Sequence, residues 1–310
     1  MVDASPLRIA TAPVNWNNSD LPGWREHVPF PLILDEMINA GFHVTEYDAA
    51  LGSDLQAISD EMTERSMMFC GAYFWIDTHD PASFERDLAG VTTRCRLLQR
   101  IGCQNLIVSD VLRPQRVACA GFVPRDGSLS LNTHGYAAMG DRLEQVAVMG
   151  AEYDIAVHYH HHAGTYIETP QEVDELVGHL AGSGVDLCFD TGHYAFGGGD
   201  PGQFIHDHPE QIGYLHLKDV SPDVLGMATT LQWGFLEALR HIVFPPLGQG
   251  SVGIDTIVQS LVERRYNGFL VIEQDTCEGD PTVTARSNLD FVLAASTGKV
   301  QSGPDQEITP

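Results

Sequence analysis

The sequence has few basic residues and no long apolar run. It has 17 Lys and Arg against 42 Asp and Glu, a formal net charge of −25 over 310 residues. Phosphate binding needs a basic footprint, so this balance argues against nucleic acid as a partner and against phosphorylated substrates. No apolar run approaches the roughly 20 residues that span a bilayer, and the N-terminus lacks the pattern of a signal peptide. We therefore expect a cytoplasmic protein with no membrane partner and an uncharged sugar or cyclitol as its substrate.

The sequence also lacks paired cysteines and a glycine-rich phosphate loop. None of its six cysteines forms a C-x-x-C pair, and Cys70 and Cys188 lie in apolar, strand-like runs. This pattern favours buried, reduced thiols over a zinc ribbon. The first predicted strand ends in PVNWNNSD rather than G-x-G-x-x-G. An open, doubly wound sheet usually shows that motif, so its absence disfavours this alternative fold.

Short β-rich runs alternate with longer amphipathic patterns along the chain. The predicted strands cover residues 8–16, 43–49, 67–76, 103–112, 154–162, 185–194, 213–220 and 268–275. The predicted helices, with Ser53 and Thr169 as N-caps, cover 30–41, 53–66, 81–102, 139–153, 169–184, 200–212, 221–243, 253–267 and 282–296, and a loop covers 113–137. Parallel strands need helical crossovers, so eight strand–helix units predict an α/β fold, the (β/α)8 TIM barrel. We expect a single domain over residues 1–310, with a core at about 8–296 and a frayed C-terminal tail at 298–310. Homo-oligomer formation is left open.

Four consecutive predicted strands end in residues that bind metals or transfer protons. The endings are HYHHH (158–162), DTGH (190–193), HLKD (216–219) and EQD (273–275). Functional residues of a barrel gather at the carboxyl ends of its strands, and side chains alternate between the two faces of a strand. The inward-facing set gives His160, Asp190, His216 and Glu273 as expected metal ligands. Two imidazoles and two carboxylates suit Mn²⁺ or Co²⁺, with Fe²⁺ and Zn²⁺ also compatible, better than Mg²⁺ or Ca²⁺.

Each of these residues also has a purely structural interpretation. Asp190 could cap the turn before Gly192, and Glu273 could be a core carboxylate satisfied by Lys218. His216 and Lys218 could pair with neighbouring carboxylates in a structural network. Four such endings in succession are harder to explain by packing than any one of them alone.

These motifs carry a family resemblance. The order of HHHAGT, DTGHYAF, LHLKDV and VIEQD, with PLGQGSVGID before the last strand, resembles the xylose-isomerase-like sugar isomerase/epimerase superfamily. Within it, APVNWNNSDLP and AGFHVTEYD are similar to the inosose dehydratases, which act on 2-keto-myo-inositol. Epimerases of the superfamily usually carry a glutamate, both ligand and base, where His160 stands. The resemblance, over about residues 8–296, therefore implies dehydration. One departure is SDVLRPQR at 109–116, where the dehydratase pattern is richer in Glu, Gln and Ser.

The resemblance implies a mechanism on a polyhydroxylated ketone. A divalent metal would bind the carbonyl and an adjacent hydroxyl and stabilise an enediolate. His162 or His193 would take the α-proton, since neutral imidazole is a suitable base near neutral pH. Lys218 or the other histidine would protonate the departing hydroxyl, or Lys218 would stabilise the enolate oxygen. Trp16 and Glu46 are expected to line the substrate pocket.

Two further classes of function remain open at this point. The first is a metal-dependent ketose isomerase or epimerase, or a related lyase that cleaves oxidised C-glycosides. The second is a non-catalytic barrel that binds a sugar or a partner subunit.

Overall fold

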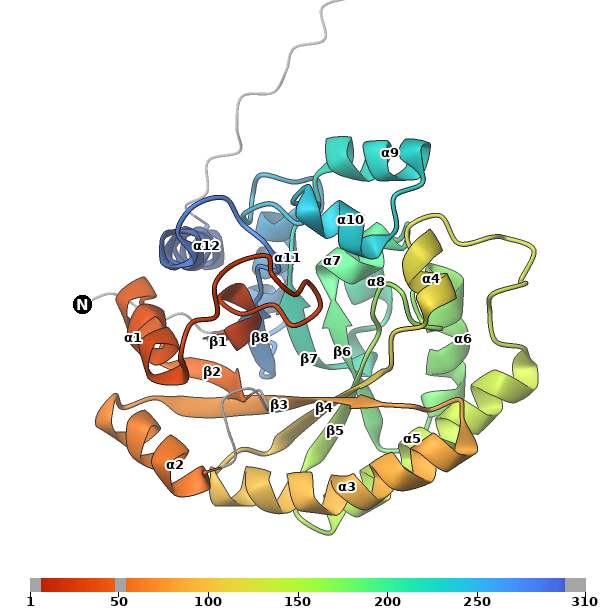
Figure 1. The fold of residues 1–310 in the computed structure, drawn as a ribbon, viewed down its shortest axis with the longest axis horizontal. Coiled ribbons are helices and arrows are strands. Elements are labelled where there is room, and N and C mark those ends of the chain that lie inside the picture. Colours follow the sequence, from red (N-terminus) through yellow and green to blue (C-terminus); the bar gives the residue numbers. More distant parts are fainter. Residues whose placement is uncertain (1–6, 48–53, 299–310) are drawn as a thin grey trace, which may run out of the picture.

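Eight parallel strands close into a barrel in sequence order, and β8 pairs with β1 (Figure 1). The structure is a computed structural model that describes residues 7–47 and 54–298. Its strands are β1 (Arg8–Thr11), β2 (Val44–Tyr47), β3 (Met68–Ile76), β4 (Asn105–Asp110), β5 (Ala156–His160), β6 (Val185–Asp190), β7 (Ile212–Leu217) and β8 (Phe269–Ile272). The predicted (β/α)8 barrel is thereby confirmed. The expected tail falls almost wholly on residues 299–310, which lie outside the described residues.

Helices surround the barrel and connect its strands. They are α1 (Phe30–Ala40), α2 (Leu55–Glu64), α3 (Pro81–Arg100), α4 (Pro114–Cys119), α5 (Thr133–Ala151), α6 (Pro170–Leu180), α7 (Thr191–Phe196), α8 (Pro201–Asp207), α9 (Pro222–Leu231), α10 (Phe235–Arg240), α11 (Ile254–Glu263) and α12 (Pro281–Ser296). Short 3-10 turns cover Pro13–Asn15 and Pro209–Gln211. None of the helices in the described part of the chain is long and apolar enough to cross a membrane.

One predicted helix cap is confirmed, and a second helix has a different cap from the one predicted. Thr169 caps α6 in a complete capping box with Glu172, as expected for a Thr-x-x-Glu pattern before an apolar run. The expected cap Ser53 lies outside the described residues. Asp54 caps α2 instead, because its carboxylate accepts hydrogen bonds from the amides of Gln56 and Ala57.

Several predicted strands run past their observed carboxyl ends, and β5, β7 and β8 end at His160, Leu217 and Ile272 rather than at residues 162, 220 and 275. β1 ends at Thr11 rather than at residue 16, because Pro13 opens a 3-10 turn. β6 ends at Asp190, whose side chain caps the short helix α7 by accepting from the amide of His193. The predicted loop at 113–137 contains α4 and the start of α5, whose N-cap is Asn132. The helix start was missed because the segment around it is rich in polar and glycine residues.

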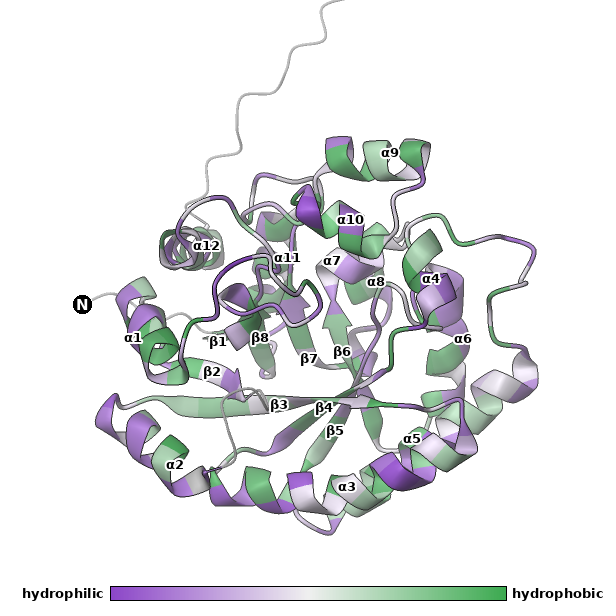
Figure 2. Ribbon diagram, viewed as in Figure 1, coloured by the Kyte–Doolittle hydropathy of each residue, from purple (hydrophilic) through white to green (hydrophobic). Residues whose placement is uncertain are grey.

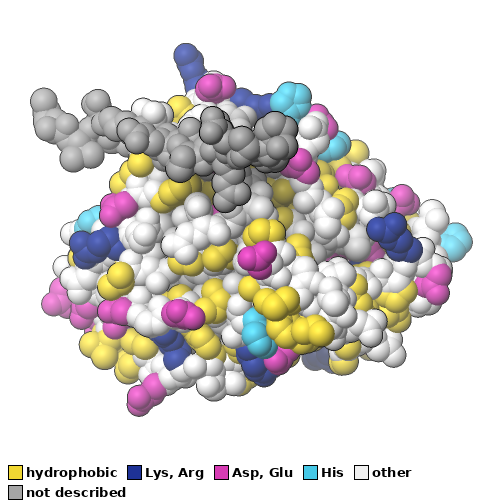
Figure 3. Space-filling model, turned by 90° about the horizontal axis from the view of Figure 1, so that it is seen from above, with side chains coloured by type: hydrophobic (Ala, Val, Ile, Leu, Met, Phe, Trp, Pro, Cys, Tyr) yellow, Lys and Arg dark blue, Asp and Glu magenta, His cyan; other side chains and the backbone are white. Residues whose placement is uncertain are grey.

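Apolar side chains fill both the barrel and the layer between barrel and helices. Inside the barrel, Ala10, Cys70, Ile107, Cys188, Tyr214, Phe269 and Val271 belong to one buried cluster. A larger cluster joins the strands to the surrounding helices; in Figure 2 the central strands are mainly hydrophobic and the outer helices mixed. All six cysteines are free thiols and only Cys119 is not fully buried, as expected. Acidic side chains are scattered over the face shown in Figure 3.

Candidate active site

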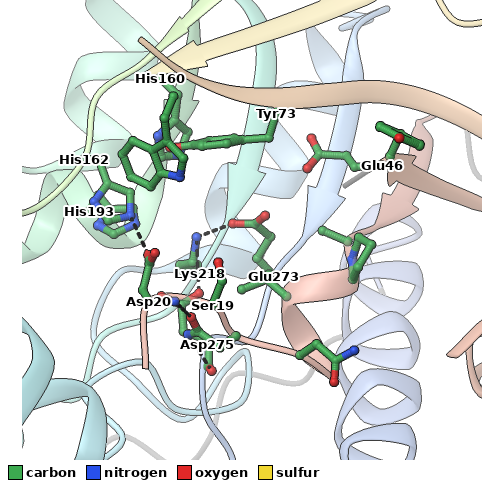
Figure 4. Close-up of a pocket in the computed structure, with 17 residues that line it drawn as sticks. Ser19, Asp20, Glu46, Tyr73, His160, His162, His193, Lys218, Glu273 and Asp275 are labelled. Atoms are coloured by element: carbon green, nitrogen blue, oxygen red, sulfur yellow. Dashed lines mark hydrogen bonds and ion pairs between the residues drawn. The ribbon is translucent and has the colours of Figure 1, made fainter. Parts of the chain in front are cut away.

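A pocket opens at the carboxyl ends of the strands (Figure 4). Its described lining residues are Ala12, Pro13, Val14, Asn17, Asn18, Ser19, Asp20, Glu46, Tyr47, Tyr73, Trp75, His160, His162, His193, Lys218, Glu273 and Asp275. The segment after β1 and the ends of β2 and β3 form one side, and residues at or after the ends of β5 to β8 form the other. In Figure 4 the three histidines lie on one side of the cavity and Glu46 on the other.

The four residues predicted as metal ligands approach one another closely. His160 Nε2 lies 3.4 Å from Asp190 Oδ2, which lies 3.7 Å from His216 Nδ1. His216 Nδ1 lies in turn 3.1 Å from Glu273 Oε2. All four residues are less than 9% exposed. A tetrahedral ion with ligands roughly 2.1 Å away holds its donor atoms about 3.4 Å apart, and each of these three neighbouring pairs is close to that separation.

Glu46 gives a second possible ligand arrangement. Its Oε1 lies 2.9 Å from His216 Nε2, and the carboxylates of Glu46 and Glu273 converge on His216 closely enough to hold an ion. His160, Asp190 and His193 form another such group. Glu46 was expected only to line the substrate pocket, and the structure places it both at the pocket wall and against an expected ligand.

Lys218 lies among three carboxylates. Its ammonium contacts Asp190 Oδ2 at 2.7 Å, also contacts Glu273 Oε2, and lies 3.5 Å from Asp275 Oδ1. Burial opposes the charge of Lys218, but these carboxylates raise its pKa well above the usual value. Burial likewise opposes ionisation of Asp190, yet the Lys218 ammonium holds the pKa of Asp190 well below its usual range. The lysine is therefore a fixed positive charge at the floor of the pocket.

The rings of His162 and His193 lie close together, with centroids 3.8 Å apart and planes inclined by 38°. His162 Nδ1 lies 2.8 Å from the Ala163 carbonyl, so Nδ1 carries the proton and Nε2 keeps a free lone pair. His193 Nδ1 lies 3.3 Å from the Ala163 amide, which donates to it, so the proton of His193 is on Nε2. The pair therefore offers one acceptor nitrogen and one N–H donor.

Burial keeps both imidazoles neutral. It lowers the pKa of His162 to about 3, with the neighbouring His160 adding to the effect. Burial also lowers the pKa of His193 well below 6.5, together with His162. The carboxylate of Asp20 lies near the His162 ring, with 3.7 Å between Asp20 Oδ2 and His162 Nε2. Neutral imidazoles can accept a proton or donate a hydrogen bond without first losing a charge.

Trp16 does not lie where we expected. The 3-10 turn at Pro13–Asn15 redirects the chain after β1, and Asn15 fixes that turn by donating to Thr11 Oγ1 and the Ile272 carbonyl. Trp16 is consequently fully buried in the core outside the barrel, where its indole N–H donates to Thr282 Oγ1. This placement corrects the expectation that Trp16 lines the pocket.

Other pocket residues were missed by sequence analysis. Tyr73 and Trp75 lie two residues apart on β3, so strand alternation could have placed both on one face. Trp75 packs edge-on against Tyr73 and against His162. Asp20 lies in an irregular segment, for which periodicity gives no signal. Together these side chains add an aromatic wall and an acidic edge to the pocket.

Comparisons with known proteins are consistent with this site. Residues 34–294 match the family model described as xylose isomerase-like TIM barrel. The chain is 29% identical over 284 residues to an inosose dehydratase of Geobacillus kaustophilus, covering 90% of each. It is also 29% identical over 305 residues to the rhizopine catabolism protein MocC of Rhizobium meliloti, covering 96% of this chain and 91% of that protein.

Solved structures show the same fold at low sequence identity. The probable 3-DHS dehydratase AsbF of Bacillus anthracis has a TM-score of 0.68 at 14% identity, covering 92% of this chain and 98% of that one. The IolI protein, solved with a bound zinc atom, has a TM-score of 0.69 at 12% identity, covering 96% and 100%. At these identities the likeness concerns the fold alone.

Proposed function

This chain belongs to the xylose isomerase-like TIM barrel family, and on that premise we propose that it is a metal-dependent dehydratase of a cyclic polyhydroxy ketone such as 2-keto-myo-inositol. One observation carries the proposal. The ends of β5 to β8 bring His160, Asp190, His216 and Glu273 together beside two neutral imidazoles. The similarity to inosose dehydratases over nine-tenths of the chain selects dehydration among the reactions of such a site.

The same four residues are the proposed metal ligands, with Mn²⁺ or Co²⁺ as the proposed ion. Their donors are two imidazole nitrogens and two carboxylate oxygens, a mixed set that first-row transition metals accept. When bound, the ion would supply a Lewis acid for the ketone oxygen and the neighbouring hydroxyl. Glu46 is proposed to bind substrate or to orient His216 through its 2.9 Å contact.

His162 is proposed as the base and His193 as the hydrogen-bond donor to the leaving hydroxyl. The free lone pair on His162 Nε2 takes the proton from the carbon next to the ketone. The Nε2–H of His193 hydrogen-bonds the hydroxyl on the following carbon, and that hydroxyl leaves as water with the proton that His162 has taken, while a carbon–carbon double bond forms. The hydrogen bonds of Ala163 fix this division of roles, because its carbonyl and amide select opposite tautomers in the two rings.

Lys218 is proposed to stabilise negative charge on the substrate oxygen during proton removal. Its ammonium lines the pocket and stays charged, because three carboxylates surround it. A buried, fixed cation stabilises developing negative charge without reorganisation. The high pKa of Lys218 makes it a poor proton donor, so of the two roles left open by sequence analysis we propose the electrostatic one.

The test is incubation of the purified protein, supplied with Mn²⁺ or Co²⁺, with 2-keto-myo-inositol. We expect loss of water and the ultraviolet absorbance of the resulting dione. An epimer in place of the dione would instead favour the isomerase class. Absence of any metal bound after reconstitution would contradict both enzyme functions.

A further inference from the structure

Three charged side chains are buried together outside the pocket, behind the turn that follows β5. They are Arg116 of α4, Glu168 before α6 and Glu172 in the first turn of α6, exposed by 1%, 1% and 3%. Two carboxylates share one guanidinium, so the group carries a surplus buried negative charge. Burying charge is costly, and such an arrangement needs compensating hydrogen bonds.

Glu172 is explained by local structure. Both of its oxygens accept hydrogen bonds from Arg116 at 2.7 Å. It also completes the capping box of α6 by accepting from the Thr169 amide at 3.0 Å. The ion pair and the start of the helix are therefore satisfied without Glu168.

Glu168 makes a different set of contacts. Its Oε2 accepts from the Gly164 amide and its Oε1 from the Gly121 amide, each at 2.7 Å. Arg116 lies further away, at 3.8 Å. One carboxylate therefore ties the turn after β5 to the segment after α4, an arrangement we call the Glu168 clasp.

The clasped turn carries His162. The His162 amide donates to the Ile167 carbonyl, and the Thr165 hydroxyl donates to the His162 carbonyl at 2.8 Å. Gly164 adopts φ +83°, and a Cβ there would lie 2.8 Å from Val117 Cγ2. The Gly164 carbonyl also accepts from the Arg113 amide. Any movement of this turn therefore moves His162 and changes the hydrogen bond that the Ala163 amide donates to His193.

We propose that Glu168 is a positioning residue that holds the 162–167 turn and thereby aims His162 Nε2 into the pocket. The proposal rests on the proposed role of His162 as the base. Glu168 does not line the pocket that holds the three histidines, although it lines a separate cavity with Glu172, and it contacts the turn through the backbone amides of Gly164 and Gly121. Support for imidazole ligands and bases through such outer contacts typically contributes about 10- to 100-fold to activity.

The experiment uses Glu168→Gln and Glu168→Ala in the full chain. The glutamine keeps one carbonyl oxygen for one amide, and the alanine keeps neither, so the effects should be graded. We expect kcat for 2-keto-myo-inositol to fall about 10-fold and about 100-fold, with KM changed less than about 3-fold and metal content unchanged. Glu175→Gln, at an exposed carboxyl of α6, is the matched control and should leave all three unchanged.

Hydrogen exchange supplies a readout that does not depend on turnover. The amides of Gly164 and Gly121 should exchange faster in both Glu168 variants, while the β5 amide of Tyr159 keeps its protection. If Glu168→Gln does not fold, Glu168→Asp replaces it, since its side chain is too short to reach both amides.

Three results would overturn the proposal. Faster exchange with unchanged kcat would make the clasp purely structural. Unchanged exchange would show that Glu168 does not hold the turn. A parallel rise in KM and loss of metal would indicate general disruption. If the wild-type protein shows no dehydration, the proposed function fails by itself, and the exchange data still decide whether the clasp exists.

Discussion

The two halves of the barrel present different chemistry to one pocket. Residues at or after the ends of β5 to β8 supply charged or ionisable groups, among them His160, His162, Lys218 and Glu273. The segment after β1 and the ends of β2 and β3 supply mainly aromatic and neutral polar groups, with Asp20 and Glu46 as acidic exceptions. We propose that one half performs the reaction while the other half holds the ring of the substrate. Substitutions in the first half should reduce turnover, and substitutions in the second should weaken binding.

The largest effect is expected for Asp190→Ala. Asp190 Oδ2 contacts His160, His216 and Lys218. Its loss therefore removes a proposed ligand and leaves the buried Lys218 ammonium without one of its carboxylate partners. Elemental analysis should find background metal, and turnover of 2-keto-myo-inositol should fall below detection. Asp186→Ala, at an exposed position on the same strand, is the control. Full activity in Asp190→Ala would contradict the assignment of the reaction to the ends of β5 to β8.

The next largest effect is expected for His162 and His193. His162→Asn and His193→Asn should each lower kcat by roughly 10²- to 10⁴-fold, the usual contribution of a general acid or base, with metal content unchanged. In D₂O, His193→Asn should still exchange the α-proton of the substrate, because His162 Nε2 remains as the base. In His162→Asn the α-proton of the substrate should not exchange. The reverse pattern would exchange the two proposed roles. His179→Asn, on the outer face of α6, is the control.

A smaller effect on stability is expected at Glu168. Burial raises its pKa to about 7 from 4.5, against the opposing effect of Arg116. A carboxyl whose pKa is raised by folding favours the folded state when protonated, so its contribution is full below pH 4.5 and lost as the pH rises to about 7. Over that window the loss is about 3 kcal/mol for the wild type.

The matching measurement is urea unfolding at several pH values. Glu168→Gln cannot ionise, so its free energy of unfolding should lack this decrease between pH 4.5 and 7. The difference in slope between the two proteins isolates Glu168 from other titrating groups. Identical slopes would mean that Glu168 ionises with an ordinary pKa despite its burial.

The smallest effect is expected in the aromatic half. Trp75→Leu removes a ring that lines the pocket and packs against Tyr73 and His162. Losing about 1 kcal/mol of aromatic contact should raise KM by roughly 5- to 10-fold, with kcat changed by less than about 3-fold. Phe74→Leu is the control, because Phe74 alternates to the other face of β3 and packs under Arg94. A collapse of kcat with unchanged KM would assign Trp75 to the reaction instead.

The sequence is sufficient to predict the barrel and the reactive half of its pocket. Apolar residues repeat with different periods in strands and in helices, so the sequence predicts eight alternating strand–helix units. The position of each strand then gives its carboxyl end. His160, Asp190, His216 and Glu273 each stand at or next to such an end. Their mutual approach depends only on the parallel order of four neighbouring strands.

The remaining pocket depends on contacts that no local pattern encodes. Trp16 turns into the core because Asn15 reaches back to the carbonyl of Ile272, 257 positions away in the chain. Arg116 and Glu172 pair across 56 positions, and Arg116 itself lies in α4, inside the segment that was predicted as a loop. Asp20 reaches His162 from an irregular segment. Tyr73 and Trp75 are different, since the alternation of β3 did contain their signal.

The most direct test is a titration of metal-stripped protein with Mn²⁺, with the ultraviolet absorbance of the dione from 2-keto-myo-inositol as the readout. We predict that the rate rises from background and saturates at about one ion per chain. Equal dione formation in the absence of metal, or none at any metal concentration, would contradict a metal-dependent dehydratase built on the ends of β5 to β8.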